Sequence, residues 1–233
     1  FGPECLRGAC VGVYQHSAVG RDVLVTVLEG LGAKVTGLGR SDTFIPVDTE
    51  AVREEDIALA RGWAGEQPFD AIVSTDGVSD RPLVADEMGE WLRGDVLAML
   101  CARVLGMQTV ITPVSSNTVA ERSGFFARVK RTRIGSPYVI AAMQAALAAG
   151  ETLVCGYEAN GGFLLGSDVR NERGVLTALP TRDAVLPIIA VLVAARGSSV
   201  SKLVADLPSR VTFSDRTADF APQRSADLMA WMT

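Results

Sequence analysis

The apolar residues of the first part of the chain alternate between two spacings. Short β-branched runs, typical of buried strands, lie at 9–14, 34–38, 71–74 and 83–85. Apolar positions that recur every three or four residues predict helices at 20–31 and 54–63. Gly32 is expected to end the first of these helices, because glycine readily adopts the positive φ found just after a helix. This order of strand, helix and strand indicates an α/β layer.

The same order of elements begins again after residue 92. Helices are predicted at 95–105, 117–123, 138–149 and 183–196, and strands at 109–112, 125–129 and 152–157. A further strand or loop begins at Leu164, and Asp95 is expected to cap the first helix of this half. Residues 209–224 are polar and show no clear period, which is typical of a connector. The predicted fold class is α/β, with two three-layer αβα domains of mixed, mainly parallel sheets at 1–92 and 93–205, and a connector at 206–233.

Composition and charge narrow the range of partners. The chain has 233 residues, of which 48% are hydrophobic and 21% charged, an ordinary globular balance. Its net charge of −5 gives no electrostatic reason to expect nucleic acid as a partner. No apolar run approaches the roughly 20 residues that span a bilayer, so no membrane partner is expected. The four cysteines form no CxxC pair and only one histidine accompanies them, so reduced thiols of a cytoplasmic protein are expected rather than a zinc site.

A cluster of acids follows the predicted strand at 71–74. The loop from Asp76 to Arg81 carries Asp76 and Asp80 on a turn that contains glycine. Carboxylates that converge on one point are what a hard divalent cation needs. Asp, Gly and Ser are also ordinary residues of a solvated surface turn, so both interpretations stay open for this loop taken alone.

The acidic loop resembles the metal loop of the α-D-phosphohexomutase family, whose pattern is Asp-Gly-Asp-x-Asp-Arg. Asp76, Asp80 and Arg81 match this pattern, and Val78 stands where the middle aspartate is expected. The resemblance implies that Asp76 and Asp80 bind Mg²⁺, and that Arg81 is a catalytic residue that binds phosphate oxygens. Val78 offers no side-chain oxygen, so we expect weakened Mg²⁺ binding unless a nearby acid such as Asp86 has taken over the position.

A second match follows the predicted strand at 152–157. The segment Gly-Tyr-Glu-Ala-Asn-Gly-Gly at 156–162 resembles the family's sugar-binding loop, typically Gly-Glu-x-Ser-Gly-His. Glu158 falls on the glutamate and Asn160 on the serine, while Gly162 replaces the histidine. The resemblance implies that Glu158, Asn160 and Gly161 bind the hydroxyl groups of a hexose phosphate. A plain strand-ending turn is the alternative, because Asn-Gly-Gly is a good turn sequence.

A third match is basic. Arg131-Thr132-Arg133-Ile134-Gly135 resembles the family segment Arg-Thr-x-Val-Gly, which histidine follows and where Ser136 stands here. Together with Lys130 these arginines form the densest basic cluster of the chain. Near a helix N-terminus they could hold a phosphate, and Arg133 is the candidate substrate ligand. A solvated basic face is the competing interpretation.

The resemblance covers nearly the whole chain, with the metal loop in the second-domain-like part at 1–92 and the sugar loop in the third-domain-like part at 93–205. It implies an enzyme that moves a phosphoryl group between C1 and C6 of a hexose through a phosphoserine and a bisphosphate intermediate. The family's serine loop, Thr-Ala-Ser-His-Asn-Pro, and its phosphate loop, Arg-x-Ser-Gly-Thr, have no counterpart in this sequence. We therefore expect a fragment of a mutase that is inactive alone, with a C-terminal domain expected beyond the connector.

Two other interpretations stay open. The chain could be a non-catalytic relative that binds sugar phosphates, because Val78 removes a metal ligand, or a plain α/β binding module. His16 has a serine neighbour but no acid beside it that would orient the ring, so a structural role is favoured over a catalytic pair. A dinucleotide site is not indicated, because no GxGxxG is present.

Overall fold

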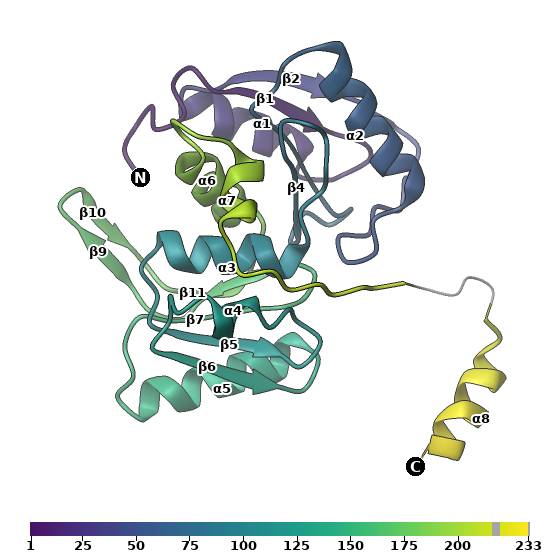
Figure 1. Cartoon of the computed structure of the whole chain (residues 1–233), viewed down its shortest axis with the longest axis vertical. Helices are drawn as coiled ribbons and strands as arrows, with labels where there is room; N and C mark the ends of the chain where they lie inside the picture. The colour runs from purple at the N-terminus through teal and green to yellow at the C-terminus, as the bar shows by residue number, and fades with distance from the viewer. Residues whose placement is uncertain (216–219, 233) are drawn as a thin grey trace.

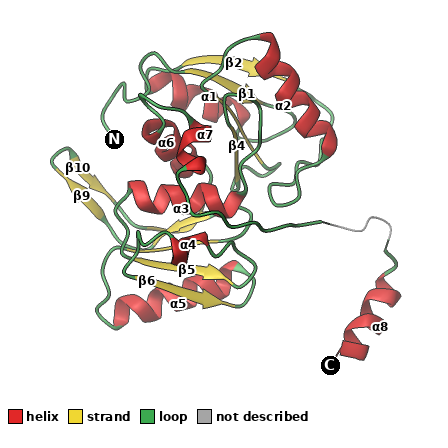
Figure 2. Cartoon of the chain, in the orientation of Figure 1, coloured by secondary structure: helices red, strands yellow, loops and turns green. Residues whose placement is uncertain are grey.

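The computed structural model describes residues 1–215 and 220–232, and the strands in this part of the chain form two large sheets and one short hairpin (Figures 1 and 2). The first sheet has the order β2-β1-β3-β4. Its strands are β1 (Cys10–Tyr14), β2 (Lys34–Leu38), β3 (Ala71–Thr75) and β4 (Pro82–Ala85). β1, β2 and β3 are parallel, and β4 runs antiparallel to β3.

Alternation along the strands decides what covers each face of the first sheet. Val11 and Val13 point into a core that includes α1 (Arg21–Gly30), whose Leu24 and Leu28 are buried. The opposite face of the sheet packs against α2 (Glu54–Glu66) through a second apolar cluster around Tyr14, Ile72, Leu83 and Ala60. The helix α1 ends as predicted, because Gly32 has a φ of +92° just beyond it.

The second sheet has the order β11-β8-β7-β5-β6. Its strands are β5 (Thr109–Pro113), β6 (Arg128–Thr132), β7 (Val154–Tyr157), β8 (Phe163–Leu165) and β11 (Leu179–Asp183). β5, β6 and β7 are parallel, and antiparallel pairing joins β7 to β8 and β8 to β11. The hairpin of β9 (Val169–Asn171) and β10 (Gly174–Leu176) extends from this half (Figure 1). The predicted α/β class with mixed, mainly parallel sheets is confirmed.

One helix lies between the two sheets. α3 (Gly94–Val104) is buried along most of its length and packs against β7 of the second sheet, β4 of the first sheet and α6 (Val185–Ala194). α5 (Ser136–Ala148) covers the other face of the second sheet through a separate apolar cluster. The largest core therefore runs without interruption from the first sheet through α3 and α6 to the second sheet. The division at 92/93 stays a prediction.

Three local predictions differ from the structure. The strand expected at 125–129 lies at 128–132, because Phe125 and Phe126 form an edge-to-face pair and Arg103 stacks 4.1 Å above the Phe125 ring. α4 covers only Val119–Arg122. Asp95 makes no cap for α3; its Oδ2 accepts a hydrogen bond of 2.7 Å from the backbone N–H of Asn117 instead.

The segment after α6 is more structured than predicted. α7 (Val200–Ala205) begins with a Ser199 cap, and α8 (Pro222–Met232) buries none of its residues (Figure 1). Between them, residues 206–215 of the predicted connector pass over α3 in Figure 1, and Ser214 Oγ accepts a 3.1 Å hydrogen bond from Arg93. Residues 216–219 of that connector lie outside the described residues. None of the helices in the described ranges is long and apolar enough to cross a membrane.

Candidate functional site

The acidic loop connects β3 to β4 at the carboxyl end of β3, where α/β sheets commonly bind ligands. Asp76 is only 7% exposed, and its Oδ1 accepts hydrogen bonds from the backbone N–H groups of Asp80 (3.0 Å) and Arg81 (3.1 Å). The carboxylate of Asp76 therefore organises the loop around itself. Val78 lies at the tip and is 68% exposed.

A serine ties this loop to the start of α1. Ser79 has a φ of +64°, which is uncommon for a residue with a side chain. Its Oγ accepts a hydrogen bond of 2.9 Å from the backbone N–H of Gly20, and the backbone N–H of Val19 donates to the carbonyl of Gly77 at 3.1 Å. Both hydrogen bonds fix the loop to the residues directly before α1, and nothing in the local sequence signalled the role of Ser79.

The predicted sugar loop is a tight turn between β7 and β8. Gly161 N–H donates to the carbonyl of Glu158 at 3.0 Å, and Gly161 has a φ of +89°. The Oδ1 atom of Asn160 accepts a 3.0 Å hydrogen bond from the backbone N–H of Gly162, which uses one of its two acceptor sites inside the turn. Thr49 Oγ1 donates to the carbonyl of Asn160 at 2.9 Å, which joins this loop to the first half of the chain.

An arginine that the sequence did not single out joins the two loops. Arg182 lies on β11, and its Nη2 forms an ion pair of 2.8 Å with Asp80 Oδ2. Its Nη1 lies 3.6 Å from Glu158 Oε2. A Cβ atom at Gly162 would lie 2.8 Å from Arg182 Cδ, so the missing side chain at this position makes room for the arginine. The structure therefore brings Asp80 and Glu158 together around one guanidinium.

Several polar atoms at this junction have no hydrogen-bond partner among the described residues. They are the buried atoms Asp80 Oδ1, Arg81 Nε and Glu158 Oε2. Arg81 Nε lies 3.8 Å from Asp80 Oδ1, which is too long for a hydrogen bond. Buried polar groups normally have a hydrogen-bond partner. These two acceptors and one cationic donor therefore have hydrogen-bonding capacity that the described residues do not use.

The acidic loop does not offer a complete donor set for a divalent cation. Two backbone amides donate to Asp76 Oδ1, Arg182 pairs with Asp80 Oδ2, and Val78 has no side-chain oxygen, so only the second oxygen of each carboxylate remains for a metal ion. Within residues 1–215 and 220–232, no group of three or more Asp, Glu, His or Cys side chains is placed to hold a metal ion. Asp86 follows β4, at the other end of that strand from the loop, so it does not replace the missing ligand.

Most of the basic cluster has structural partners. Arg131 donates to the carbonyls of Pro113 and Ser116 and forms an ion pair of 2.7 Å with Glu121, while Lys130 pairs with Glu151. Arg133 is exposed just before α5, with its guanidinium carbon 5.9 Å from the centroid of the Tyr138 ring. No hydrogen bond or ion pair of the described residues joins Arg133 to the acidic loop or the sugar loop.

His16 lies buried behind the acidic loop. Its Nε2 lies 2.9 Å from the carbonyl oxygen of Thr75, and its ring packs against Tyr14 at 5.1 Å. Burial lowers the pKa of His16 below its ordinary value. These contacts agree with the expected structural role: the neutral ring supports the end of β3 from which the acidic loop departs.

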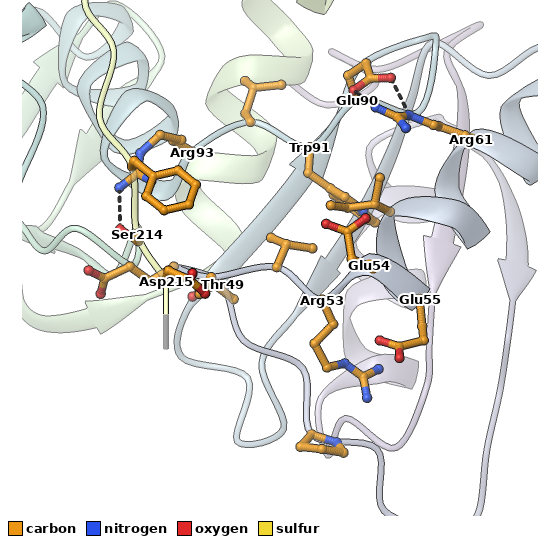
Figure 3. Close-up of a pocket in the computed structure, with 17 residues that line it drawn as sticks. Thr49, Arg53, Glu54, Glu55, Arg61, Glu90, Trp91, Arg93, Ser214 and Asp215 are labelled. Atoms are coloured by element: carbon orange, nitrogen blue, oxygen red, sulfur yellow. Dashed lines mark hydrogen bonds and ion pairs between the residues drawn. The ribbon is translucent and has the colours of Figure 1, made fainter. Parts of the chain in front are cut away.

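A cavity of about 750 Å³ lies beside these loops (Figure 3). It is lined by the segment before α2, by α2 itself, by residues 90–93 and by Phe213, Ser214 and Asp215. Thr49 and Arg93 line it too, and Gly94, next to Arg93, packs against the backbone of Asn160. Burial raises the pKa of Glu50 on its wall. None of the predicted site residues lines this cavity, so it neighbours the candidate site without forming it.

The architecture and the two strand-end loops define an α/β/α protein with an acidic loop and a Glu-Ala-Asn-Gly loop facing one shared arginine. The family model described as "Phosphoglucomutase/phosphomannomutase, alpha/beta/alpha domain III" matches residues 93–211. The chain belongs to this family, which confirms the predicted phosphohexomutase resemblance.

Relatives and solved structures agree with this family. The chain is 50% identical to a "Phosphomannomutase" of Salmonella muenchen, over 96% of this chain and 47% of the relative. It is 48% identical to a "Phosphomannomutase" of Sinorhizobium fredii, over 97% of this chain and 48% of the relative. A structure of a "Phosphoglucomutase/phosphomannomutase family protein" from Burkholderia thailandensis has the same fold, with a TM-score of 0.69 at 16% identity, over 88% of this chain and 44% of that one. The chain spans about half the length of the curated relatives it matches.

Proposed function

We propose that this chain is the central part of a phosphohexomutase that interconverts hexose 1-phosphates and 6-phosphates through a phosphoserine and a bisphosphate intermediate. The observation that carries the proposal is the meeting of Asp80 and Glu158, from loops of two different sheets, at the guanidinium of Arg182. The name of the two relatives at about half identity favours mannose phosphate among the hexose phosphates.

Each residue of the junction has a role in this proposal. Glu158 Oε2 has no hydrogen-bond partner among the described residues and accepts one from a sugar hydroxyl, while the amide NH₂ of Asn160 donates one. Gly161 provides the positive φ that turns the loop toward the sugar. Arg81 binds oxygens of the phosphate being transferred, because its guanidinium matches their geometry. Arg133 is proposed to hold the second, non-reacting phosphate.

Phosphoryl transfer depends mainly on positioning and on neutralising the charge of the phosphoryl group. The serine that gives up its phosphoryl group in the family belongs to a loop without a counterpart in this sequence. We therefore propose that the chain alone holds part of the sugar site and does not turn over substrate. We also propose that it acts in the cytoplasm and that it binds Mg²⁺ weakly, since the acidic loop lacks the middle aspartate.

A second candidate is a non-catalytic relative that binds sugar phosphates. Val78, exposed at the tip of the acidic loop, is the observation that favours it, because it removes a charged oxygen ligand without disturbing the fold of the loop. The reading frame upstream of Phe1 separates the two candidates. A serine loop encoded there supports the mutase, and a loop without serine supports the binding protein.

A titration with mannose 1-phosphate, followed by amide NMR, tests sugar-phosphate binding by the chain. We expect the signals of Gly161, Gly162 and Arg81 to shift with ligand concentration. The variant Glu158→Gln should bind at least about tenfold more weakly, since a charged acceptor contributes about 1.5–3 kcal/mol. Glu172→Gln, on the exposed hairpin, is the matched control and should bind like the parent chain.

Either of two results contradicts sugar binding at this junction: no shift at saturating ligand, or equal affinity for the Glu158→Gln and Glu172→Gln variants. A coupled assay tests the second half of the proposal. We expect no conversion of hexose 1-phosphate to 6-phosphate by the chain alone, and turnover by a preparation shown to be free of contaminating mutase would contradict it.

A further inference from the structure

The junction of the two loops carries more negative than positive side chains. Asp76, Asp80 and Glu158 are the acids, and all three are buried or half-buried. The family resemblance implies that a metal ion neutralises this charge, yet the loop lacks a complete set of metal ligands. A cationic side chain of the protein itself would neutralise part of the same negative charge.

Arg182 is placed to supply it. The register of β11 against β8 shifts between Leu179 and Asp183, and such an irregularity can redirect a side chain. Asp183 is fixed by hydrogen bonds from the backbone N–H groups of Val185 (2.8 Å) and Leu186 (3.2 Å) at the start of α6. Arg182 directly precedes Asp183 on β11, so the backbone of Arg182 is held both by the strand and by the start of α6.

The path of the arginine depends on a glycine in the sugar loop. The Cγ and Cδ atoms of Arg182 would lie 3.0 and 2.8 Å from a Cβ atom at Gly162. A contact this short forces one of the two groups to move, and the Arg182 side chain is the flexible one, so a larger residue at 162 would displace the guanidinium from Asp80 and Glu158. The position of the Arg182 side chain therefore depends on the glycine at position 162.

Arg81 is less well placed than Arg182 to neutralise the acids of the two loops. Its Nε lies 3.8 Å from Asp80 Oδ1 without a hydrogen bond, and its side chain is 38% exposed. Arg182 pairs at 2.8 Å and is 29% exposed, and it alone of the two reaches Glu158. The shorter and less hydrated contact carries the stronger electrostatic interaction.

We propose that Arg182 is an internal counter-ion that takes the place of a divalent cation between the acidic loop and the sugar loop. Its single positive charge offsets part of the charge of Asp80 and Glu158 and fixes the two loops relative to each other. A divalent cation that approaches Asp80 meets this guanidinium at the same carboxylate and is repelled by it. Arg182 is accordingly a positioning residue whose charge sets the low metal affinity of the loop.

Calorimetric titration with MgCl₂ tests the proposal, and it needs no sugar phosphate, so its failure is separate from failure of the proposed sugar-phosphate binding. We expect weak or undetectable Mg²⁺ binding by the parent chain. Arg182→Met should bind Mg²⁺ at least about tenfold more tightly, because a unit charge within 4 Å is removed. Arg182→Lys keeps the charge and should bind as weakly as the parent.

Arg170→Met is the matched control, because Arg170 pairs with Asp168 at 3.1 Å on the exposed hairpin, and it should leave Mg²⁺ binding unchanged. Circular dichroism confirms that each variant is folded. If Arg182→Met does not fold, Arg182→Gln, which keeps a polar side chain without the charge, gives the same comparison. Tight Mg²⁺ binding by the parent chain, or unchanged affinity in the folded neutral variant, overturns the proposal.

Discussion

The acidic loop and the sugar loop hold their shapes by different means. In the acidic loop a side chain fixes the shape, because Asp76 Oδ1 accepts hydrogen bonds from the backbone N–H groups of two later residues. In the sugar loop the backbone does it, through Gly161 and its close contact with Gly94. The exposed tip of the first loop therefore tolerates a change such as Val78, while the second loop has no room for added atoms.

The largest effect is expected at the packing of the sugar loop. A Cβ atom at Gly94 would lie 2.4 Å from the carbonyl carbon of Asn160 and 2.5 Å from the nitrogen of Gly161. Overpacking typically costs 1–3 kcal/mol, and here the clash is with backbone, so we expect Gly94→Ala to lower the free energy of unfolding by about 3 kcal/mol. Urea unfolding followed by circular dichroism measures this value.

Gly62→Ala is the control for that experiment. Gly62 lies on the exposed side of α2 with nothing within 4 Å of an added Cβ, so alanine should raise stability by about 0.5–1 kcal/mol. Opposite signs for the two substitutions support the close-packed interpretation of the sugar loop. A neutral Gly94→Ala would show that the loop moves aside.

A smaller loss is expected in the acidic loop. Asp76→Ala removes an ionised acceptor and leaves the backbone N–H groups of Asp80 and Arg81 without a partner. We expect a loss of about 2 kcal/mol in the free energy of unfolding. Asp42→Ala is the control, since the Asp42 side chain is 96% exposed and should contribute less than about 0.5 kcal/mol. Equal effects of the two variants would argue against Asp76 as the organiser of its loop.

The acidic loop should also be the pH-sensitive one, because His16 lies behind it while Gly162 replaces the histidine in the other loop. Burial lowers the pKa of His16, so the unfolded chain binds a proton that the folded chain resists. Stability contributed by the neutral ring is present above about pH 6.5 and falls as the pH drops below it.

The expected loss from His16 is at most about 1.4 kcal/mol per pH unit, the limit for one proton. Urea unfolding at pH 7 and pH 5 should show a steeper decline in the parent chain than in His16→Asn, which tolerates the positive φ of 30°. The difference between the two declines isolates His16 from the other titrating groups. Parallel declines would mean that His16 does not couple to folding in this range.

The sequence predicted the elements whose apolar residues follow one period. α1 and β2 were predicted within one residue of their observed ends, because Leu24 and Leu28 recur at helical spacing and short apolar runs flank the helix. β11 was missed because most of this edge strand is exposed and polar, so no alternation marks it. The pairing of Arg182 with Asp80 joins residues about a hundred positions apart, and no local pattern encodes such a contact.

Site prediction had the same limit. The acidic loop and Glu158 were found from the sequence because each belongs to a short continuous motif. The structure places Asp80 and Glu158 at one guanidinium. The inward hydrogen bond of Asn160 Oδ1 could not be foreseen, since it depends on the turn that Gly162 closes. Assignment of these residues to sugar and metal binding stays a prediction that the titrations address.

The smallest structural effect, and the sharpest test of the comparison, is expected at Val78. Val78 is 68% exposed and makes no contact on which the loop depends, so Val78→Asp should change the free energy of unfolding by less than about 0.5 kcal/mol. The new carboxylate adds an oxygen ligand and a negative charge beside Asp76 and Asp80, so Mg²⁺ binding measured by calorimetry should become tighter. With Arg182 in place that gain should be modest, because the guanidinium still occupies Asp80 Oδ2. Val78→Asp combined with Arg182→Met should therefore bind Mg²⁺ more tightly than the two single gains predict. Tight binding by the unmutated chain, or no gain from the aspartate in either background, would show that this loop is a surface turn rather than a weakened metal loop.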